Sequence, residues 1–306
     1  RLNSIVSPLT RRGEYDTQSP SRNYISRIKP NVMKGPIGVF DSGYGGLTVL
    51  KELVRALPGY DFLYLGDNAR TPYGTRSFNV VYQYSLQAVR YLLAQHCPLV
   101  ILACNTASAK ALKNIQVLDL PHIGPDRRVL GVIRPSVEKA AEITRNGQVG
   151  VLGTVGTVVS ESYPMELEKW SGGRIVSTVQ EACPMWVPIV ENNEIGSAGA
   201  DFFIKKNIDN ILSKDRELDT LILGCTHYPL LIEVIKRHLP PHIEILEQGR
   251  IVSEKLVDYL KKKPDLARRI SRNGQTLFRT TEYPEVFESK AALFMGHPVK
   301  AENAHL

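Results

Sequence analysis

The chain has 306 residues, 43% of them hydrophobic and 23% charged, which is ordinary globular usage and allows one large domain or two of average size. No apolar run approaches the ~20 residues of a membrane helix, and the N-terminus lacks the apolar core of a secretory signal, so we expect a cytoplasmic protein. The net charge of +7 does not indicate nucleic-acid binding, because residues 1–34 account for +5 of it and the remaining 272 residues carry only +2.

The first segment, residues 1–33, contains Ser, Arg and Pro and has no sustained apolar periodicity. Such composition is typical of chain termini that do not join a packed core. We therefore expect residues 1–33 to form a disordered extension without a folded role.

From Gly35 onward, short apolar runs alternate with helical patterns. A strand is predicted over 36–40, a helix over 47–57 after Gly45 and Gly46, and a strand over 61–65. A long helix over 80–94 then precedes a strand over 99–103. Later strands are predicted over 129–133, 148–152, 174–178, 220–223 and 243–246.

Strands that alternate with helices predict an α/β fold with mainly parallel sheets, whose faces right-handed crossovers cover with helices. We expect two similar domains of this kind. Residues 34–131 and 245–306 would form the first, residues 132–244 the second, and an active site would lie in the cleft between them.

Two stretches of the chain resemble each other. Residues 99–106 read Leu-Val-Ile-Leu-Ala-Cys-Asn-Thr, and residues 220–227 read Thr-Leu-Ile-Leu-Gly-Cys-Thr-His. Each is an apolar strand that ends in a small residue and a cysteine, and each leads into a predicted helix. The two cysteines, Cys104 and Cys225, are 121 residues apart, which is about one domain length.

A cysteine at the carboxyl end of such a strand would lie beside the free backbone N–H groups of the next helix. We expect these groups to favour the thiolate and to lower the pKa of the thiol below about 8.5, and also to bind a carboxylate. Two such cysteines on opposite faces of a stereocentre, one a thiolate and one a thiol, could invert it by proton transfer. The sequence therefore favours an enzyme that inverts a stereocentre by proton transfer.

The other two cysteines, Cys97 and Cys183, each precede a proline, and we expect them to serve packing only. The four cysteines are too scattered for a disulfide framework and lack CxxC pairs. With no metal-ligand set and no dinucleotide fingerprint, nothing in the sequence requires a metal or a cofactor.

Three further loops follow predicted strands and would open onto the same edge of the sheets. They are residues 41–46 (Asp-Ser-Gly-Tyr-Gly-Gly), residues 66–74 (Gly-Asp-Asn-Ala-Arg-Thr-Pro-Tyr-Gly) and residues 151–157 (Val-Leu-Gly-Thr-Val-Gly-Thr). The first is not a phosphate-binding P-loop, because no Gly-Lys-Ser/Thr follows it. Each could be an ordinary turn, but together with the paired cysteines they indicate a site.

The motifs Gly38–Gly43, Asp67–Gly74, Ala103–Ala107 and Gly224–Pro229 together resemble glutamate racemase. They occur in that family's order, and the resemblance extends from about Pro36 to near the C-terminus. The segment from Glu181 to Pro188 and Gly131-Val-Ile-Arg-Pro also resemble family segments.

The resemblance implies a cofactor-independent enzyme that interconverts L- and D-glutamate and supplies D-glutamate for peptidoglycan. By this resemblance Cys104 would remove the α-proton of D-glutamate and Cys225 that of L-glutamate. Asp41 and His227 would orient or tune the thiols and also contact the substrate. The remaining substrate contacts would come from Ser42, Tyr73, Gly74, Asn105, Thr106 and Thr226, with Thr154 and Thr157 as further candidates.

The resemblance also implies a homodimer, with glutamate as the small-molecule partner and a peptidoglycan precursor as an activator in some relatives. Three alternatives stay open at this point. An aspartate racemase-like enzyme is disfavoured, because such relatives tend to carry an acidic residue where this chain has His227. A non-catalytic amino-acid-binding protein would not need paired cysteines. A role in binding DNA gyrase, reported for some relatives, could use the basic N-terminal segment.

Overall fold

The computed structural model describes residues 34–306, and the predicted extension over residues 1–33 lies outside them. Ten strands form two separate sheets, in both of which all neighbouring strands are parallel. Parallel strands covered by helices on both faces are continuously apolar, as in Phe62–Gly66, where every residue is buried. The α/β fold class with two parallel sheets is therefore confirmed.

The first sheet has the strand order β10-β9-β2-β1-β3-β4. Its strands are β1 (Ile37–Asp41), β2 (Phe62–Gly66), β3 (Leu99–Leu102), β4 (Arg128–Gly131), β9 (Thr276–Thr280) and β10 (Ala301–Asn303). The second sheet has the order β6-β5-β7-β8. Its strands are β5 (Gln148–Gly153), β6 (Ser177–Ala182), β7 (Thr220–Gly224) and β8 (Glu244–Leu246).

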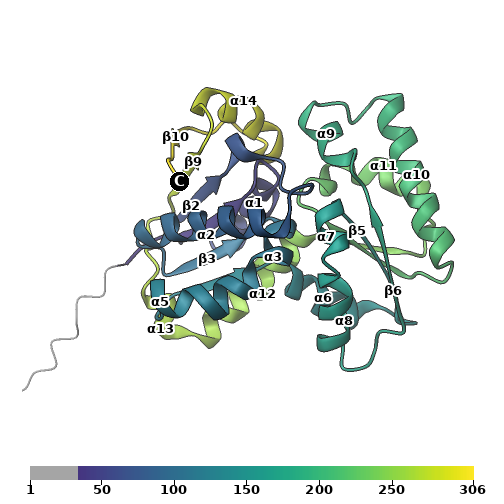
Figure 1. Ribbon diagram of the computed structural model, residues 1–306, viewed down its shortest axis with the longest axis horizontal. Helices are drawn as coiled ribbons and strands as arrows, with labels where there is room; N and C mark the ends of the chain where they lie inside the picture. The colour runs from purple at the N-terminus through teal and green to yellow at the C-terminus, as the bar shows by residue number, and fades with distance from the viewer. Residues whose placement is uncertain (1–33) are drawn as a thin grey trace, which may run out of the picture. The chain divides into compact units, whose positions relative to one another are not determined.

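Helices surround both sheets (Figure 1). Those between the strands of the first sheet are α1 (Gly46–Ala56), α2 (Phe78–Ala94), α3 (Asn105–Lys110), α4 (Leu112–Asn114), a π-helical turn (Ile115–Asp119), α5 (Leu120–Ile123) and α14 (Pro284–Met295), while α13 (Pro264–Arg268) directly precedes β9. Those between the strands of the second are α7 (Val155–Val159), α8 (Ser162–Trp170), α9 (Trp186–Glu191), α10 (Ala198–Lys214) and α11 (Ile232–His238). Short 3₁₀ turns cover Asn68–Arg70 and Tyr228–Leu231.

The chain passes between the two sheets twice. The helix α6 (Ile133–Ile143) leads from β4 of the first sheet to β5 of the second, and α12 (Gln248–Lys262) leads from β8 back toward β9. The predicted domain limits stay a prediction; the limit at residues 244 and 245 falls within β8.

Two predicted strands need correction, and two further strands were missed. The strand predicted over 174–178 is β6 at Ser177–Ala182. It is a half-buried edge strand with polar residues, so it has no continuous apolar pattern, whereas the apolar Val176 before it is largely exposed. The strand predicted over 129–133 ends at Gly131, because α6 begins at Ile133. Two strands, β9 and β10, were not predicted. In the case of β10 the reason is that it is a short polar edge strand without an apolar pattern.

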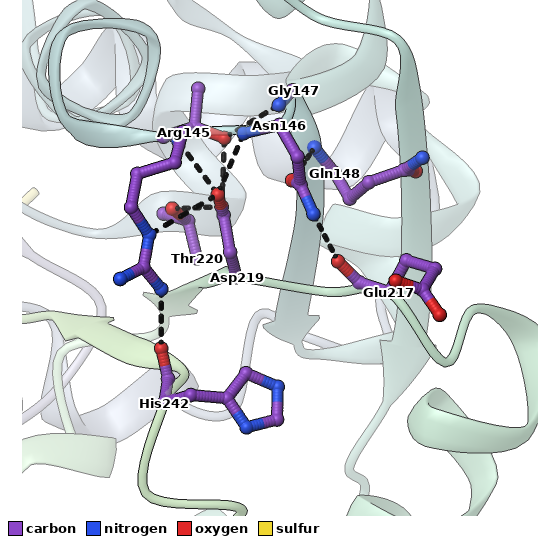
Figure 2. Close-up of polar contacts among 9 residues, drawn as sticks. Arg145, Asn146, Gly147, Gln148, Glu217, Asp219, Thr220 and His242 are labelled. Carbon is purple, nitrogen blue, oxygen red and sulfur yellow. Dashed lines mark hydrogen bonds and ion pairs between the residues drawn. The ribbon is translucent and has the colours of Figure 1, made fainter.

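A buried carboxylate anchors the amino-terminal ends of the strands in the second sheet (Figure 2). Asp219, just before β7, accepts hydrogen bonds from Thr144 Oγ1 at 2.7 Å, Arg145 N at 2.6 Å, Asn146 N at 2.9 Å and Thr220 Oγ1 at 2.7 Å. These bonds tie the loop before β5 to the start of β7. Cys225 follows the opposite end of β7, so this cluster is structural and lies away from it.

Candidate active site

The two cysteine loops occupy equivalent places in the two sheets. Cys104 follows β3 and caps the start of α3, while Cys225 follows β7 directly and precedes the 3₁₀ turn that begins at Tyr228. Both cysteines are only 6% exposed. The predicted strand–cysteine–helix arrangement is present at Cys104, whereas at Cys225 a 3₁₀ turn comes before helix α11.

The surroundings of Cys104 are neutral or acidic. Its Sγ lies 3.3 Å from Ser42 Oγ and accepts a hydrogen bond from Ala107 N at 3.4 Å. Burial raises the pKa of the Cys104 thiol to about 12, the nearby Asp41 carboxylate adds to this, and the two hydrogen bonds only partly oppose it. The expected lowering of this pKa by the helix start is therefore wrong: α3 has only six residues, and loss of water outweighs its dipole.

The surroundings of Cys225 contain a cation. Its Sγ lies 3.8 Å from His227 Nδ1, and His227 Nε2 lies 2.9 Å from Glu191 Oε1. Burial opposes protonation of the imidazole, but its hydrogen bonds with Cys225 and Glu191 raise the pKa of His227 to about 10. A protonated His227 therefore pairs with Glu191 on one side and faces the Cys225 sulfur on the other.

Asp41 ends β1 between the two thiol environments. Its Oδ2 accepts a hydrogen bond from Gly43 N at 2.9 Å, while its buried Oδ1 has no hydrogen-bond partner among residues 34–306. Burial raises the pKa of Asp41, and the charge of His227 opposes this shift. A buried acceptor without a partner is costly, which is consistent with a binding role for Oδ1.

The loop after Asp41 reaches the loop of the second cysteine. A Cβ added at Gly45 would lie 2.2 Å from Thr226 Oγ1 and 2.4 Å from His227 Nδ1. Thr48 Oγ1, in the helix that follows, donates a hydrogen bond to Thr226 O at 2.9 Å. Only glycine permits this approach, so the Gly-rich turn predicted after the first strand brings the two halves of the site together.

The other predicted loops also meet across the two sheets. Gly156 N donates a hydrogen bond to Gly74 O at 2.7 Å, and Thr106 Oγ1 lies 3.0 Å from Thr154 Oγ1 and 3.4 Å from Thr157 Oγ1. Three hydroxyl groups from two sheets therefore cluster beside Cys104. This arrangement agrees with the expectation that these loops share one edge.

Two predicted substrate-binding side chains already have protein partners. The buried Tyr73 hydroxyl donates a hydrogen bond to Asp67 Oδ2, which also pairs with Arg70 Nε at 2.7 Å. The Asn105 amide is bonded to Tyr163 and Gln248. Their contacts with a substrate stay predictions.

Four residues near the site were not predicted: Thr48, Tyr163, Glu191 and Gln248. Glu191 is the last residue of the short helix α9, three positions after the segment from Glu181 to Pro188 that the sequence singled out. A single carboxylate at a helix end carries no sequence signal of a partner 36 residues away, so only the fold reveals its contact with His227.

Among residues 34–306, no group of three or more His, Cys, Asp or Glu side chains could hold a metal ion. None of the helices in the described part of the chain is both long and apolar enough to cross a membrane.

Known proteins resemble this chain over most of its length. The family model for Asp/Glu/Hydantoin racemase matches residues 37–252. A glutamate racemase of Persephonella marina is 40% identical over 274 residues, which cover 88% of this chain and 97% of that protein.

Solved structures show the same fold. A glutamate racemase isoform of Bacillus anthracis matches with a TM-score of 0.79 and 34% identity, covering 89% of this chain and 98% of that one. The glutamate racemase of Francisella tularensis in complex with D-glutamate matches with a TM-score of 0.77 and 29% identity, covering 89% and 97%. With these matches and its paired cysteine loops, the chain belongs to the Asp/Glu/Hydantoin racemase family, and within that family to the glutamate racemases.

Proposed function

We propose that this protein interconverts L- and D-glutamate by proton transfer between the substrate and two cysteines, Cys104 and Cys225. The observation that carries the proposal is the equivalent placement of two buried cysteines after β3 and β7, linked by the loop from Asp41 to Gly46. The relatives named as glutamate racemases, one of them solved with D-glutamate, support glutamate as the substrate.

In the direction from D- to L-glutamate, the Cys104 thiolate takes the α-proton and the Cys225 thiol delivers its own proton to the opposite face of Cα. Turnover then leaves Cys104 as a thiol and Cys225 as a thiolate, which is the form that accepts L-glutamate. Turnover of L-glutamate in the reverse direction restores the Cys104 thiolate and the Cys225 thiol. Each turnover therefore takes up one proton and gives back one, without a cofactor.

The two thiol environments support different resting states for the two cysteines. Burial raises the pKa of Cys104 to about 12, so this thiol stays protonated, whereas Cys225 Sγ faces His227 Nδ1 at 3.8 Å. With Cys104 protonated, the free enzyme accepts L-glutamate once Cys225 has lost its proton. Entry of D-glutamate would require a proton to move from Cys104 to Cys225.

Removal of an α-proton needs donors that stabilise the developing charge on the substrate. Ser42, Thr106 and Thr226 lie around the thiols and offer hydroxyl groups for the carboxylates, and Thr154 and Thr157 extend this set. Asp41 Oδ1 offers an acceptor for the substrate ammonium group. These roles belong to the proposal.

Wider roles also stay predictions: supply of D-glutamate for peptidoglycan, a cytoplasmic location, a homodimer, and activation by a peptidoglycan precursor. Binding of DNA gyrase stays an alternative that a supercoiling assay with purified gyrase would test.

The deciding experiment is incubation with L-glutamate in D₂O, with optical rotation and deuterium at Cα followed together. We expect racemisation with deuterium uptake, lost in Cys104→Ser and in Cys225→Ser. Cys97→Ser is the matched control, because Cys97 is buried before β3 while Cys104 follows that strand, and it should keep full turnover. No exchange with either enantiomer of glutamate would contradict the proposal, and exchange with aspartate instead would identify an aspartate racemase.

A further inference from the structure

A buried polar network lies directly beside Cys104. Asn105, the first residue of α3, forms a reciprocal amide pair with Gln248, the first residue of α12. Asn105 Nδ2 donates to Gln248 Oε1 at 2.5 Å, and Gln248 Nε2 donates to Asn105 Oδ1 at 3.1 Å. Both side chains are 3% exposed, so their amides cannot exchange these partners for bulk water.

Two further residues complete the network. The Tyr163 hydroxyl donates to Asn105 Oδ1 at 2.7 Å and accepts from Gln248 Nε2 at 2.7 Å. Gln248 Nε2 also donates to Ser136 Oγ at 2.9 Å. Gln248 Nε2 has two protons for these three acceptors, and its shorter contacts are those with Tyr163 and Ser136. The Tyr163 hydroxyl is therefore the main donor to Asn105 Oδ1, and Asn105 Nδ2 keeps one proton beyond that given to Gln248.

The network stands where the chain passes between the sheets. Ser136 lies on α6 and Gln248 on α12, which are the two helices that connect one sheet to the other. Asn105 follows Cys104 in the first sheet, and Tyr163 lies on α8 of the second. The position of the Asn105 amide is thus set jointly by both sheets and both connections.

We infer that Gln248 and Tyr163 are positioning residues, which hold the Asn105 amide in the orientation that binds the substrate. This inference rests on the proposed function and on the prediction, from the family resemblance, that Asn105 contacts the substrate. Because its oxygen accepts from Tyr163 and its nitrogen donates to Gln248, the Asn105 amide has a fixed orientation and offers a ligand its remaining Nδ2 proton, and a donor is what a carboxylate requires. Because cross-linked buried networks rigidify their members, the donor is also preorganised.

A donor to a substrate carboxylate acts in the ground state as well as in the transition state, so its loss weakens substrate binding and raises KM. A purely structural role would instead lower the melting temperature and the active fraction without changing KM.

The test uses the full chain with Tyr163→Phe, Gln248→Met and the double variant, all of which keep side-chain volume. We expect KM for both enantiomers to rise about tenfold in each single variant, the scale of one lost buried hydrogen bond, with kcat within about threefold of wild type. Because both residues act through one amide, the double variant should raise KM little further.

The matched control is Thr144→Val in the Asp219 cluster, a comparable buried network at the other end of β7 (Figure 2). It should lower the melting temperature and leave KM at the wild-type value. Wild-type protein without glutamate turnover would overturn the proposed function and this inference with it. Wild-type turnover combined with an unchanged KM in Tyr163→Phe and Gln248→Met would overturn this inference alone.

Discussion

His227 Nε2 lies 2.9 Å from Glu191 Oε1, and this contact separates the two cysteines into different electrostatic environments. The carboxylate keeps the imidazole charged, and the opposite ring nitrogen faces Cys225 Sγ at 3.8 Å. Within residues 34–306 no equivalent cation faces Cys104, whose charged neighbour is Asp41. The racemase would thus be chemically asymmetric although its two cysteine loops are alike.

Glu191→Gln should slow the step at Cys225. Without the carboxylate, the pKa of His227 falls and less imidazolium faces the sulfur. Enantiomers have equal free energy, so kcat/KM must stay equal in the two directions for every variant, and asymmetry is visible only in separate steps. We expect kcat from L-glutamate to fall about tenfold, the scale of one lost charge-assisted hydrogen bond, together with a larger isotope effect for α-deuterated L-glutamate than for the D-enantiomer.

The matched control is Glu194→Gln, an exposed carboxylate three residues later, which should leave both isotope effects unchanged. Equal isotope effects for the two enantiomers in Glu191→Gln would contradict the assigned role of Glu191.

Cys225 should react with iodoacetamide before Cys104 at neutral pH. Only the thiolate attacks, the pKa of Cys104 is raised to about 12, and both sulfurs are equally buried. Peptide mass spectrometry after short exposure would locate the label. His227→Asn should remove most of this preference, and faster labelling of Cys104 in the wild type would show that the resting state is assigned to the wrong cysteine.

Gly45→Ala should damage the site without unfolding the protein. The new methyl group would meet Thr226 Oγ1 at 2.2 Å and His227 Nδ1 at 2.4 Å, which forces the two loops apart. A displacement of about 1 Å near the reacting groups can cost about a hundredfold, so we expect kcat/KM to fall by about that factor. Gly59→Ala, where an added Cβ meets nothing within 4 Å, should keep wild-type activity.

The Asp219 cluster should stabilise the fold in a pH-dependent manner. Burial opposes ionisation of Asp219, but hydrogen bonds from Thr144, Thr220 and two backbone N–H groups outweigh it and lower its pKa. A carboxyl whose pKa is lower in the folded state adds stability above its unfolded pKa, near 3.9, and loses it as pH falls through the folded value.

We therefore expect Asp219→Ala to lower the free energy of unfolding by about 2–4 kcal/mol at pH 7 and by less in acid. The substitution leaves the buried N–H and O–H donors around this carboxylate without an acceptor. Urea denaturation at pH 7 and at about pH 2.5, below the unfolded pKa of an aspartate, would measure this difference. The exposed Asp209→Ala should cost at most about 1 kcal/mol, since its partner is a surface lysine. A loss for Asp219→Ala that does not shrink in acid would contradict the assigned ionic contribution.

Local sequence was sufficient to predict the α/β class and the pairing of the two cysteine loops. Buried parallel strands are continuous apolar runs, as at Leu99–Leu102 and Thr220–Gly224, and the residues after them must lie at the carboxyl edge of a sheet. The edge strands β6 and β10 were misplaced or missed, because a strand exposed to solvent needs no apolar pattern.

Only the tertiary structure decided how each site residue behaves. The contact of Glu191 with His227, the amide pair of Asn105 with Gln248, and the raised pKa of Cys104 all depend on groups distant in sequence and on the loss of water around them. A motif specifies which chemical groups end a strand. Burial and long-range partners determine their charge and orientation, because both depend on what the fold packs against them.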